Sequence, residues 1–281
     1  MVVNSFSEYW EQIVPRISKD QSEILFLRGQ ANGEYQKILP GTARPQNLLD
    51  ESEEYKGIQI DYPDEFRRNE HLSNLVKMQH YGCTTRLLDF SMNPLVALFF
   101  ASEDEFKKNG KVFVISVPKE KILYQYSDKA TMLACLPVFS KKDRDDIRDF
   151  CIKHPDKITD QDIQDSNVMR RFLHEIRNEN PAFVTEIIGN DLLQYYFIRP
   201  YKDNERMKTQ AGAFAIFGLN EEKLVDDINQ ETEIIEISAS AKPQILRELE
   251  VMQINISTVY PGLERRAMIQ RNKTARWQAQ Y

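Results

Sequence analysis

The stretch that decides the fold reads MQHYGCTTRLLDFSMNP and spans residues 78–94. It begins within a helix predicted from about Asp64 to His80, where Gly82 can adopt the left-handed backbone conformation that ends a helix. It finishes with Asn93 and Pro94, which form the N-cap and first turn of a second, apolar helix. The polar residues between the two helices are therefore expected to lie around a helix break.

Short apolar runs on both sides of this stretch predict strands. They are rich in β-branched and aromatic residues and lie at 24–27, 111–117, 194–200, 212–218 and 232–238. The first run is expected to stop at a turn formed by Arg28, Gly29 and Gln30. Because strands and helices do not alternate strictly, we expect an α+β fold with a mixed or antiparallel sheet, rather than a doubly wound parallel sheet.

The remaining segments have helical patterns. An N-terminal helix is predicted from an apolar stripe of Phe6, Trp10, Ile13 and Val14. Residues 140–181 are highly charged, and we expect them to form a helical insertion that faces water. Its apolar stripes are Ile147, Phe150 and Cys151, then Val168, Phe172 and Ile176. Near the end we expect a helix over 242–250, a short β-like stretch over 253–259 and a final helix.

The composition is that of a globular protein, with 281 residues of which 41% are hydrophobic and 28% are charged. No stretch approaches the roughly 20 apolar residues that would span a bilayer, and the first residues carry no secretory pattern, so we expect a cytoplasmic protein without a membrane contact. The three cysteines are far apart, which argues against a disulfide framework or a zinc cage, and no metal is expected.

The net charge of −6 argues against a protein that coats nucleic acid non-specifically. The end of the chain differs, because residues 264–277 are basic with an interleaved aromatic residue, and the tail over 271–281 continues this pattern. Such a tail binds nucleic acid or a partner protein, or else is a solvated helix end. The sequence leaves both interpretations open.

The first segment that can carry chemistry is LFLRGQ, residues 25–30. An arginine at the end of an apolar strand is costly without an anionic partner, and the planar fork of Arg28 suits a carboxylate or a phosphate. Gly29 lacks the side chain that would block the close approach of a ligand. The alternative is a structural salt bridge followed by a turn glycine.

The second segment, residues 79–89, brings a histidine, two threonine hydroxyls, an arginine and a carboxylate together. His80 is predicted to face inward, and amid so much polar chemistry we interpret it as a site residue rather than as a core histidine. Asp89 is either part of the same site or the cap of the next helix. Cys83 beside His80 is disfavoured as a nucleophile and base pair, because no third orienting group is evident.

The third segment is RMKTQAGAF, residues 206–214, where Gln210 is expected at a strand edge with its amide free to contact a ligand. The alternative is a polar turn. Sequence motifs for dinucleotide binding, for a P-loop, for a zinc protease helix and for an EF-hand are absent from the chain.

Together these segments resemble the FRG domain family, which is named for a phenylalanine-arginine-glycine motif. The matching elements are the Phe26, Arg28, Gly29 and Gln30 unit, the HYGxxTRLLD block at 80–89, NPLVALFFA at 93–101, the QxGxF run at 210–214 and YPGLE at 260–264. Three positions depart from the pattern: Leu27 is an extra residue, Thr84 replaces a common proline and Phe90 a usual tryptophan. The resemblance implies a single FRG-type domain over 1–281, with core segments 18–139 and 182–270 around the insertion.

The first motif is also similar to that of ADP-ribosyltransferase folds. This resemblance implies that NAD is the substrate and that Arg28 grips it, with Gly29, Gln30, Tyr81, Thr85 and Arg86 lining the binding site. It implies catalytic roles for His80, Asp89 and Gln210, although these enzymes usually use a late glutamate, for which neither Glu186 nor Glu205 is singled out. The reaction would cleave the nicotinamide–ribose bond and transfer ADP-ribose to RNA, protein or water.

FRG domains are similar to components of bacterial toxin and phage-defence systems, so a neutralising or regulatory partner protein is also implied. Two other functions stay open. His80, Asp89 and the basic tail would fit a nuclease or another effector directed at RNA or DNA. The charged helices over 140–181 would fit a non-catalytic sensor that passes ligand binding on to a partner.

Overall fold

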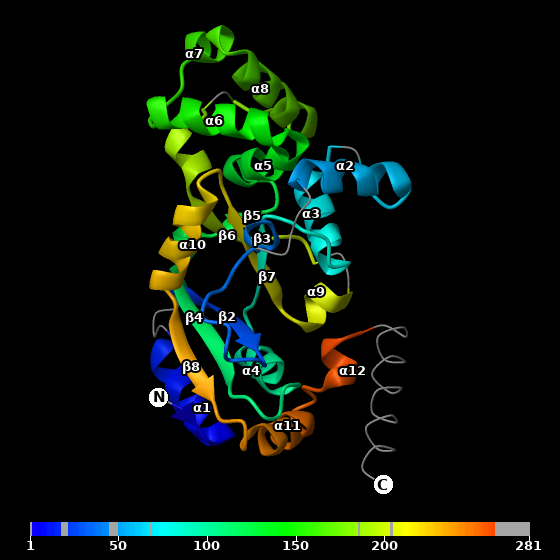
Figure 1. The fold of residues 1–281 in the computed structure, drawn as a ribbon, viewed down its shortest axis with the longest axis vertical. Coiled ribbons are helices and arrows are strands. Elements are labelled where there is room, and N and C mark those ends of the chain that lie inside the picture. The colour runs from blue at the N-terminus through cyan, green and yellow to red at the C-terminus, as the bar shows by residue number, and fades with distance from the viewer. Residues whose placement is uncertain are drawn as a thin grey trace.

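A computed structural model describes residues 2–17, 22–44, 50–67, 69–184, 186–202 and 205–261 of the chain. Within these residues one eight-stranded sheet has the order β1-β8-β4-β2-β3-β7-β6-β5, and helices cover it at one end and on its faces (Figure 1). Its strands are β1 (Val2–Val3), β2 (Glu23–Gln30), β3 (Leu87–Ser91), β4 (Gly110–Pro118), β5 (Leu123–Tyr124), β6 (Tyr195–Arg199), β7 (Gly212–Phe217) and β8 (Glu233–Ile237). The two edge pairs are parallel and the inner pairs antiparallel, so the predicted α+β fold with a mixed sheet is confirmed.

The helices come from every part of the chain. In chain order they are α1 (Phe6–Ile13), α2 (Glu51–Asp61), α3 (His71–His80), α4 (Pro94–Ser102), α5 (Asp128–Cys135), α6 (Lys141–Lys153), α7 (Asp160–Asp165), α8 (Asn167–Glu179), α9 (Glu205–Thr209), α10 (Glu221–Gln230), α11 (Lys242–Val251) and α12 (Ile256–Val259). In Figure 1, α5 to α8 form a helical layer above the sheet, and α1, α4 and α11 pack around its lower half.

β2 is longer than the sequence predicts. It pairs with β4 along its whole length, from Glu23 opposite Pro118 to Gln30 opposite Lys111, so the expected turn at Arg28 is wrong. The reason for the glycine is packing. A Cβ on Gly29 would lie 2.0 Å from the carbonyl oxygen of Ala97 in α4, so only glycine lets this helix rest on the strand.

The sheet divides at its centre. Among the described residues β2 and β3 share a single residue pair, Leu27 with Ser91, whereas β3 pairs with β7 along its whole length. The strands of one half are β1, β8, β4 and β2, and those of the other half are β3, β7, β6 and β5. Backbone groups that face the division need partners other than a neighbouring strand.

Three apolar clusters fill the described part of the protein. One lies between the lower sheet and α1, α4 and α11, and a second lies on the aromatic side chains of the central strands. The third joins α3, α5, α6 and α8. It includes Ile147, Cys151, Phe172 and Ile176, so the predicted stripes are largely confirmed, but the insertion also builds a core of its own rather than only facing water.

Several predicted boundaries are wrong for identifiable reasons. α3 begins at His71 rather than near Asp64, because the residues before it form turns. In α1 the buried residues are Tyr9 and Ile13, whereas Trp10 remains 38% exposed.

The sheet also begins earlier than the predicted core boundary, because β1 precedes residue 18. The expected β-like stretch over 253–259 contains α12, which starts at the capping residue Asn255. The expected final helix and the basic tail lie outside the described residues. No helix in the described part is both long and apolar enough to cross a bilayer.

Replacing Gly29 by alanine tests the packing of α4 on β2. We expect Gly29→Ala to lower the free energy of unfolding by about 3 kcal/mol or more, because the backbone of α4 cannot move away cheaply. The matched control is Gly57→Ala in α2, where a Cβ meets nothing within 4 Å and helix propensity predicts a gain of about 0.5–1 kcal/mol. Urea unfolding followed by circular dichroism measures both; equal effects at the two glycines would contradict the packing argument.

Candidate active site

The guanidinium of Arg28 lies at the division between β2 and β3. Its Nη1 donates a hydrogen bond of 2.9 Å to the backbone carbonyl oxygen of Asp89, and the same nitrogen lies 3.6 Å from the Asp89 carboxylate. The arginine side chain is 18% exposed and the aspartate side chain 50%. Arg28 thus replaces a missing ladder bond on β3 while holding one half-exposed carboxylate.

The hydrogen-bonding capacity of Arg28 is incompletely used. Its Nε is buried and has no hydrogen-bond partner. Burial lowers the pKa of Arg28; Asp89 opposes this effect, and the positive charge of Arg44 adds to it. Arg44 is exposed and forms no ion pair with any residue that the structure describes. Two positive charges and one carboxylate leave an excess of positive charge around Arg28, which favours an anionic ligand.

A short chain of side chains fixes the orientation of Asp89. Gln79, one residue before the end of α3, donates from Nε2 to the Asp89 carboxylate at 2.6 Å. Its own Oε1 accepts a 2.6 Å bond from the hydroxyl of Thr85, and that hydroxyl accepts from the backbone N–H of Leu87. Thr85 is fully buried, so it positions Asp89 through Gln79 instead of touching a ligand. The helix cap that was an alternative for Asp89 is supplied by Asn93.

Arg86 has a structural role that the sequence did not predict. Its side chain is buried against Glu51 of α2, with a 3.0 Å bond from Nε to the Glu51 carboxylate and a further bond to the carbonyl oxygen of Phe217. Both side chains are about 5% exposed. The donors of Arg86 are used inside the protein, and its place in the lining of the binding site stays a prediction.

His80 and Tyr81 lie where α3 ends. The two rings are in edge contact, with centroids 5.2 Å apart, and Tyr81 is 69% exposed. The backbone carbonyl oxygen of His80 accepts a 3.4 Å bond from Arg206 of α9. His80 is half-buried, so it does not lie in a closed core.

Gln210 does not have the free amide that was predicted. Its Nε2 donates to the backbone carbonyl oxygen of Val259 at 3.0 Å, and the backbone carbonyl oxygen of Gln210 accepts from the Ser91 hydroxyl at 2.7 Å. Gln210 therefore ties α12 and β3 to the start of β7. Gln30, by contrast, keeps a buried Oε1 without a hydrogen-bond partner, at the end of β2.

The remaining candidates lie elsewhere or are unreactive. Burial raises the pKa of Cys83, which disfavours its thiolate as a nucleophile at neutral pH. Glu186 forms an exposed ion pair with Lys157, and Glu205 forms one with Lys208. Neither glutamate is therefore placed by the structure as the late catalytic carboxylate.

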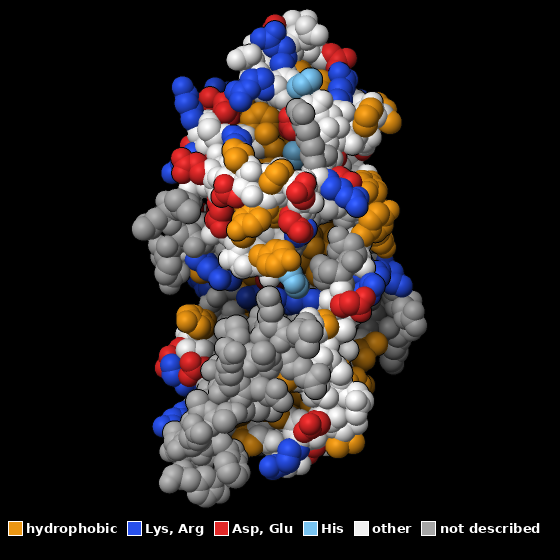
Figure 2. Space-filling model, turned by 90° about the vertical axis from the view of Figure 1, so that its right-hand side faces the viewer, with side chains coloured by type: hydrophobic (Ala, Val, Ile, Leu, Met, Phe, Trp, Pro, Cys, Tyr) orange, Lys and Arg blue, Asp and Glu red, His pale blue; other side chains and the backbone are white. Residues whose placement is uncertain are grey.

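Figure 2 shows the face of the molecule that carries α2, α3, α9 and α12. A band of basic side chains and one histidine crosses the middle of this face, at the height of α9 and the end of α3. Acidic and hydrophobic side chains gather above the band. Basic side chains also lie nearer the top of this face, among acidic ones.

The fold and this site define an α+β protein whose divided central sheet carries an arginine–aspartate pair. Residues 23–110 match the family model of the FRG domain. The family recognised from the sequence motifs is thereby confirmed over this range, which runs from the start of β2 to the start of β4 and contains α3, β3 and α4. No curated protein and no solved structure matches the chain.

Sequence reasoning missed two residues of the site. Arg44 follows a glycine-containing turn and has no motif around it, so only the folded loop brings its charge to Arg28. Gln79 belongs to the motif block, but its amide was given no role. Its membership of the same polar block as Thr85 and Asp89 was the usable signal.

The buried pair of Arg86 and Glu51 gives a direct test of the structural role assigned to it. Glu51→Gln leaves a buried guanidinium without its countercharge, and we expect it to lower the free energy of unfolding by about 3–5 kcal/mol. Glu233→Gln removes a carboxylate from an exposed pair with Arg16 and should cost less than about 1 kcal/mol. Urea unfolding of the two variants provides the comparison. A small change in the free energy of unfolding of Glu51→Gln would contradict the structural role assigned to Arg86.

Proposed function

We propose that the Arg28 and Asp89 site binds NAD and cleaves its nicotinamide–ribose bond, in the manner of an ADP-ribosyltransferase or an NAD glycohydrolase. The observation that carries the proposal is the guanidinium of Arg28, which lies at the sheet division with an unused buried Nε and is acted on by the positive charge of Arg44. A pyrophosphate offers the charge and the oxygen atoms that two such guanidiniums can bind. The similarity of the first motif to ADP-ribosyltransferase folds supports NAD as the pyrophosphate compound.

Asp89 is the group proposed to act on the reacting bond. It is the half-exposed carboxylate next to Arg28, and Gln79 holds it in one orientation. When the glycosidic bond breaks, its electron pair leaves with neutral nicotinamide, and positive charge develops on the ribose ring. A carboxylate stabilises such an oxocarbenium-like state and can then take the proton of the attacking hydroxyl group or water.

The other predicted residues have supporting roles in this proposal. His80 and the exposed Tyr81 lie at the end of α3, where they would border the nicotinamide or the acceptor. Thr85 acts through Gln79, and Gln210 fixes the start of β7. The proposal therefore depends on one arginine pair and one carboxylate, with no metal in the chemical step.

Asp89→Asn tests the catalytic role, because asparagine keeps the shape of the side chain and can still accept a bond from Gln79. We expect nicotinamide release from NAD by the pure full-length chain to fall by about 10²–10⁴-fold. Asp226→Asn, which alters an exposed aspartate paired with Lys37, should release nicotinamide at the wild-type rate. Chromatography of the reaction products measures both variants with NAD in the presence of total cellular RNA and protein.

Arg44→Gln separates binding from chemistry at the same site. Losing one charge-assisted bond to the pyrophosphate should raise KM by about tenfold or more and leave kcat nearly unchanged. A wild-type chain that neither binds NAD nor releases nicotinamide would refute the proposal. Binding without turnover would support the non-catalytic sensor instead.

A sensor is the second candidate because the helical layer offers open surfaces. A groove of about 870 Å³ runs along α6 and the turns after it, lined by Asp143, Asp146 and Asp149 together with Lys142 and Lys153. Such a mixed-charge groove fits a partner protein of complementary charge. The nuclease alternative has no comparable support, because the residues that the structure describes place no further carboxylate with His80 and Asp89 as a metal-ligating group.

The biological consequence we propose is that of a toxin or phage-defence effector, which a regulatory partner would restrain. Expression of the full chain in bacterial cells should then arrest growth and lower cellular NAD, because the reaction consumes a shared cofactor. Cells expressing Asp89→Asn at the same level should grow normally. Growth curves with NAD assays provide the measurement, and equal toxicity of the two chains would exclude NAD cleavage as its cause.

A further inference from the structure

A second cluster of reactive side chains lies inside the helical layer, away from the sheet division. One ring nitrogen of His71, the Sγ of Cys135 and a carboxylate oxygen of Glu179 lie within 4.8 Å of one another. They come from α3, α5 and α8 respectively. His71 and Cys135 are buried, at 5% and 0% exposure, so this group is not an ordinary surface cluster.

The geometry points to a zinc site formed by His71, Cys135, Glu179 and Glu175. Imidazole, thiolate and carboxylate are the ligand types that Zn²⁺ takes in proteins, usually four at a time. Glu175 qualifies because its carboxylate lies 3.1 Å from Nε2 of His71. Metal–ligand bonds of about 2.0–2.3 Å place tetrahedral ligand atoms roughly 3.3–3.8 Å apart, so the ligand atoms of His71, Cys135 and Glu179 need to close in by only about 1 Å.

The charge of the cluster also calls for a cation. Glu175 and Glu179 are one turn apart on α8, and therefore share a face of that helix. Within the described residues no lysine or arginine forms an ion pair with either of them, and the salt bridge of Glu175 is to His71. Both carboxylates are half-buried, and one histidine cannot neutralise the two of them, so the cluster favours a cation.

Tyr55 of α2 supplies the partner that a zinc-bound histidine normally has. Its hydroxyl lies 2.8 Å from Nδ1 of His71, and the tyrosine is 2% exposed. A hydrogen bond at Nδ1 fixes the ring and leaves Nε2 to bind the metal. Tyr55 is thus a positioning residue rather than a ligand.

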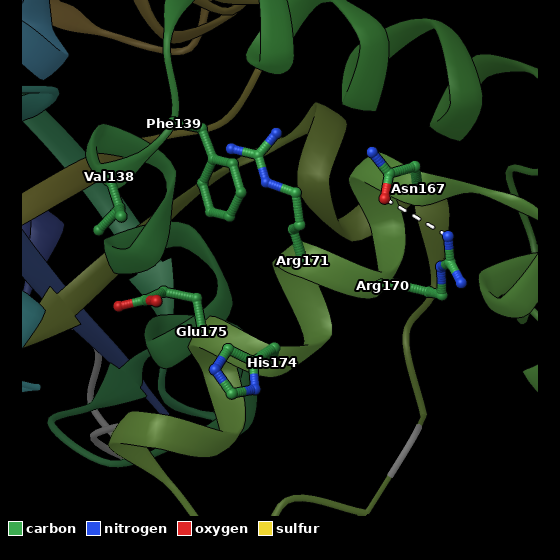
Figure 3. A pocket seen from close by; sticks show the side chains of 7 residues that line it. All are labelled: Val138, Phe139, Asn167, Arg170, Arg171, His174 and Glu175. Atoms are coloured by element: carbon green, nitrogen blue, oxygen red, sulfur yellow. Dashed lines mark hydrogen bonds between the residues drawn. The ribbon is translucent and has the colours of Figure 1, made fainter.

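An entry path exists on the outer side of the cluster. Glu175 lines a groove of about 520 Å³ between α8 and the turn after α5, and its side chain is 21% exposed. Figure 3 shows its carboxylate on the opposite side of the groove from Arg170, while Arg171 lies over the ring of Phe139. A metal ion can therefore reach Glu175 from solvent before it meets the buried ligands.

The position of the site gives it a consequence for the Arg28 region. His71 starts α3 and Gln79 lies near its end, about 12 Å further along the helix axis. α3 lies within the FRG match, whereas α5 and α8 follow it in the chain. Bound zinc would link α3 to α5 and α8. It would thereby fix the position of the helix that carries Gln79, the hydrogen-bond partner of Asp89.

Zinc titration of the full-length chain tests the proposal. Protein stripped with a chelator and then dialysed should bind one Zn²⁺ per chain, measured by elemental mass spectrometry, and its Tm should rise with added zinc. Cobalt in place of zinc should give a thiolate-to-metal charge-transfer absorption. A wild-type chain that binds no zinc at micromolar concentration would overturn the proposal without any mutant.

The variants assign the ligands. Cys135→Ser should abolish the charge-transfer absorption and weaken zinc binding by about 100-fold or more, and Tyr55→Phe by about 10-fold. Cys151→Ser, at a cysteine buried in the same core outside the cluster, and His174→Gln, on α8 but outside the cluster, should bind zinc as the wild type does. Unchanged affinity in Cys135→Ser, or equal losses in all four variants, would refute the assignment.

Discussion

The bond from Arg28 to the backbone of Asp89 is the contact on which the rest of the structure depends. It spans the place where the sheet has no regular ladder, because β2 and β3 share only the pair of Leu27 and Ser91 among the described residues. A carbonyl oxygen at such a division needs a donor, and a long arginine side chain can supply one from the neighbouring strand. Because this carbonyl oxygen needs a donor, a guanidinium lies at the division, where a ligand can reach it. The structural and the proposed functional roles of Arg28 therefore share one cause.

The surroundings of that bond explain why the motif residues stand together in sequence. Asp89 is on β3, and the residues that orient it, Gln79 and Thr85, lie just before that strand. Arg86 serves a different purpose, since it anchors α2 through Glu51 and leaves the site to its neighbours. The block therefore contains both the residues of a polar site and an arginine whose buried ion pair stabilises the helix packed next to that site.

The two polar clusters of the protein occupy the two ends of α3. At one end Gln79 meets the half-exposed Asp89, and at the other His71 meets buried sulfur and carboxylate groups. Each end is held by residues from distant parts of the chain. A ten-residue helix fixed in this way is a rigid spacer, so a change at the buried cluster has a direct path to the orientation of Asp89.

The sequence alone determined the strands β2, β4, β6, β7 and β8, the N-cap at Asn93, the stop at Gly82 and the motif that identifies the FRG domain, because these depend on neighbouring residues and on short periodic patterns. It did not predict β1, β3 or β5. It could not predict that Gly29 serves helix packing, that Arg86 is neutralised by Glu51, or that Arg44 approaches Arg28. It also gave no sign of the group formed by His71, Cys135 and Glu179, whose members stand on three separate helices. Those facts depend on which surfaces meet when the chain folds, and local patterns carry no information about partners so far away along the chain.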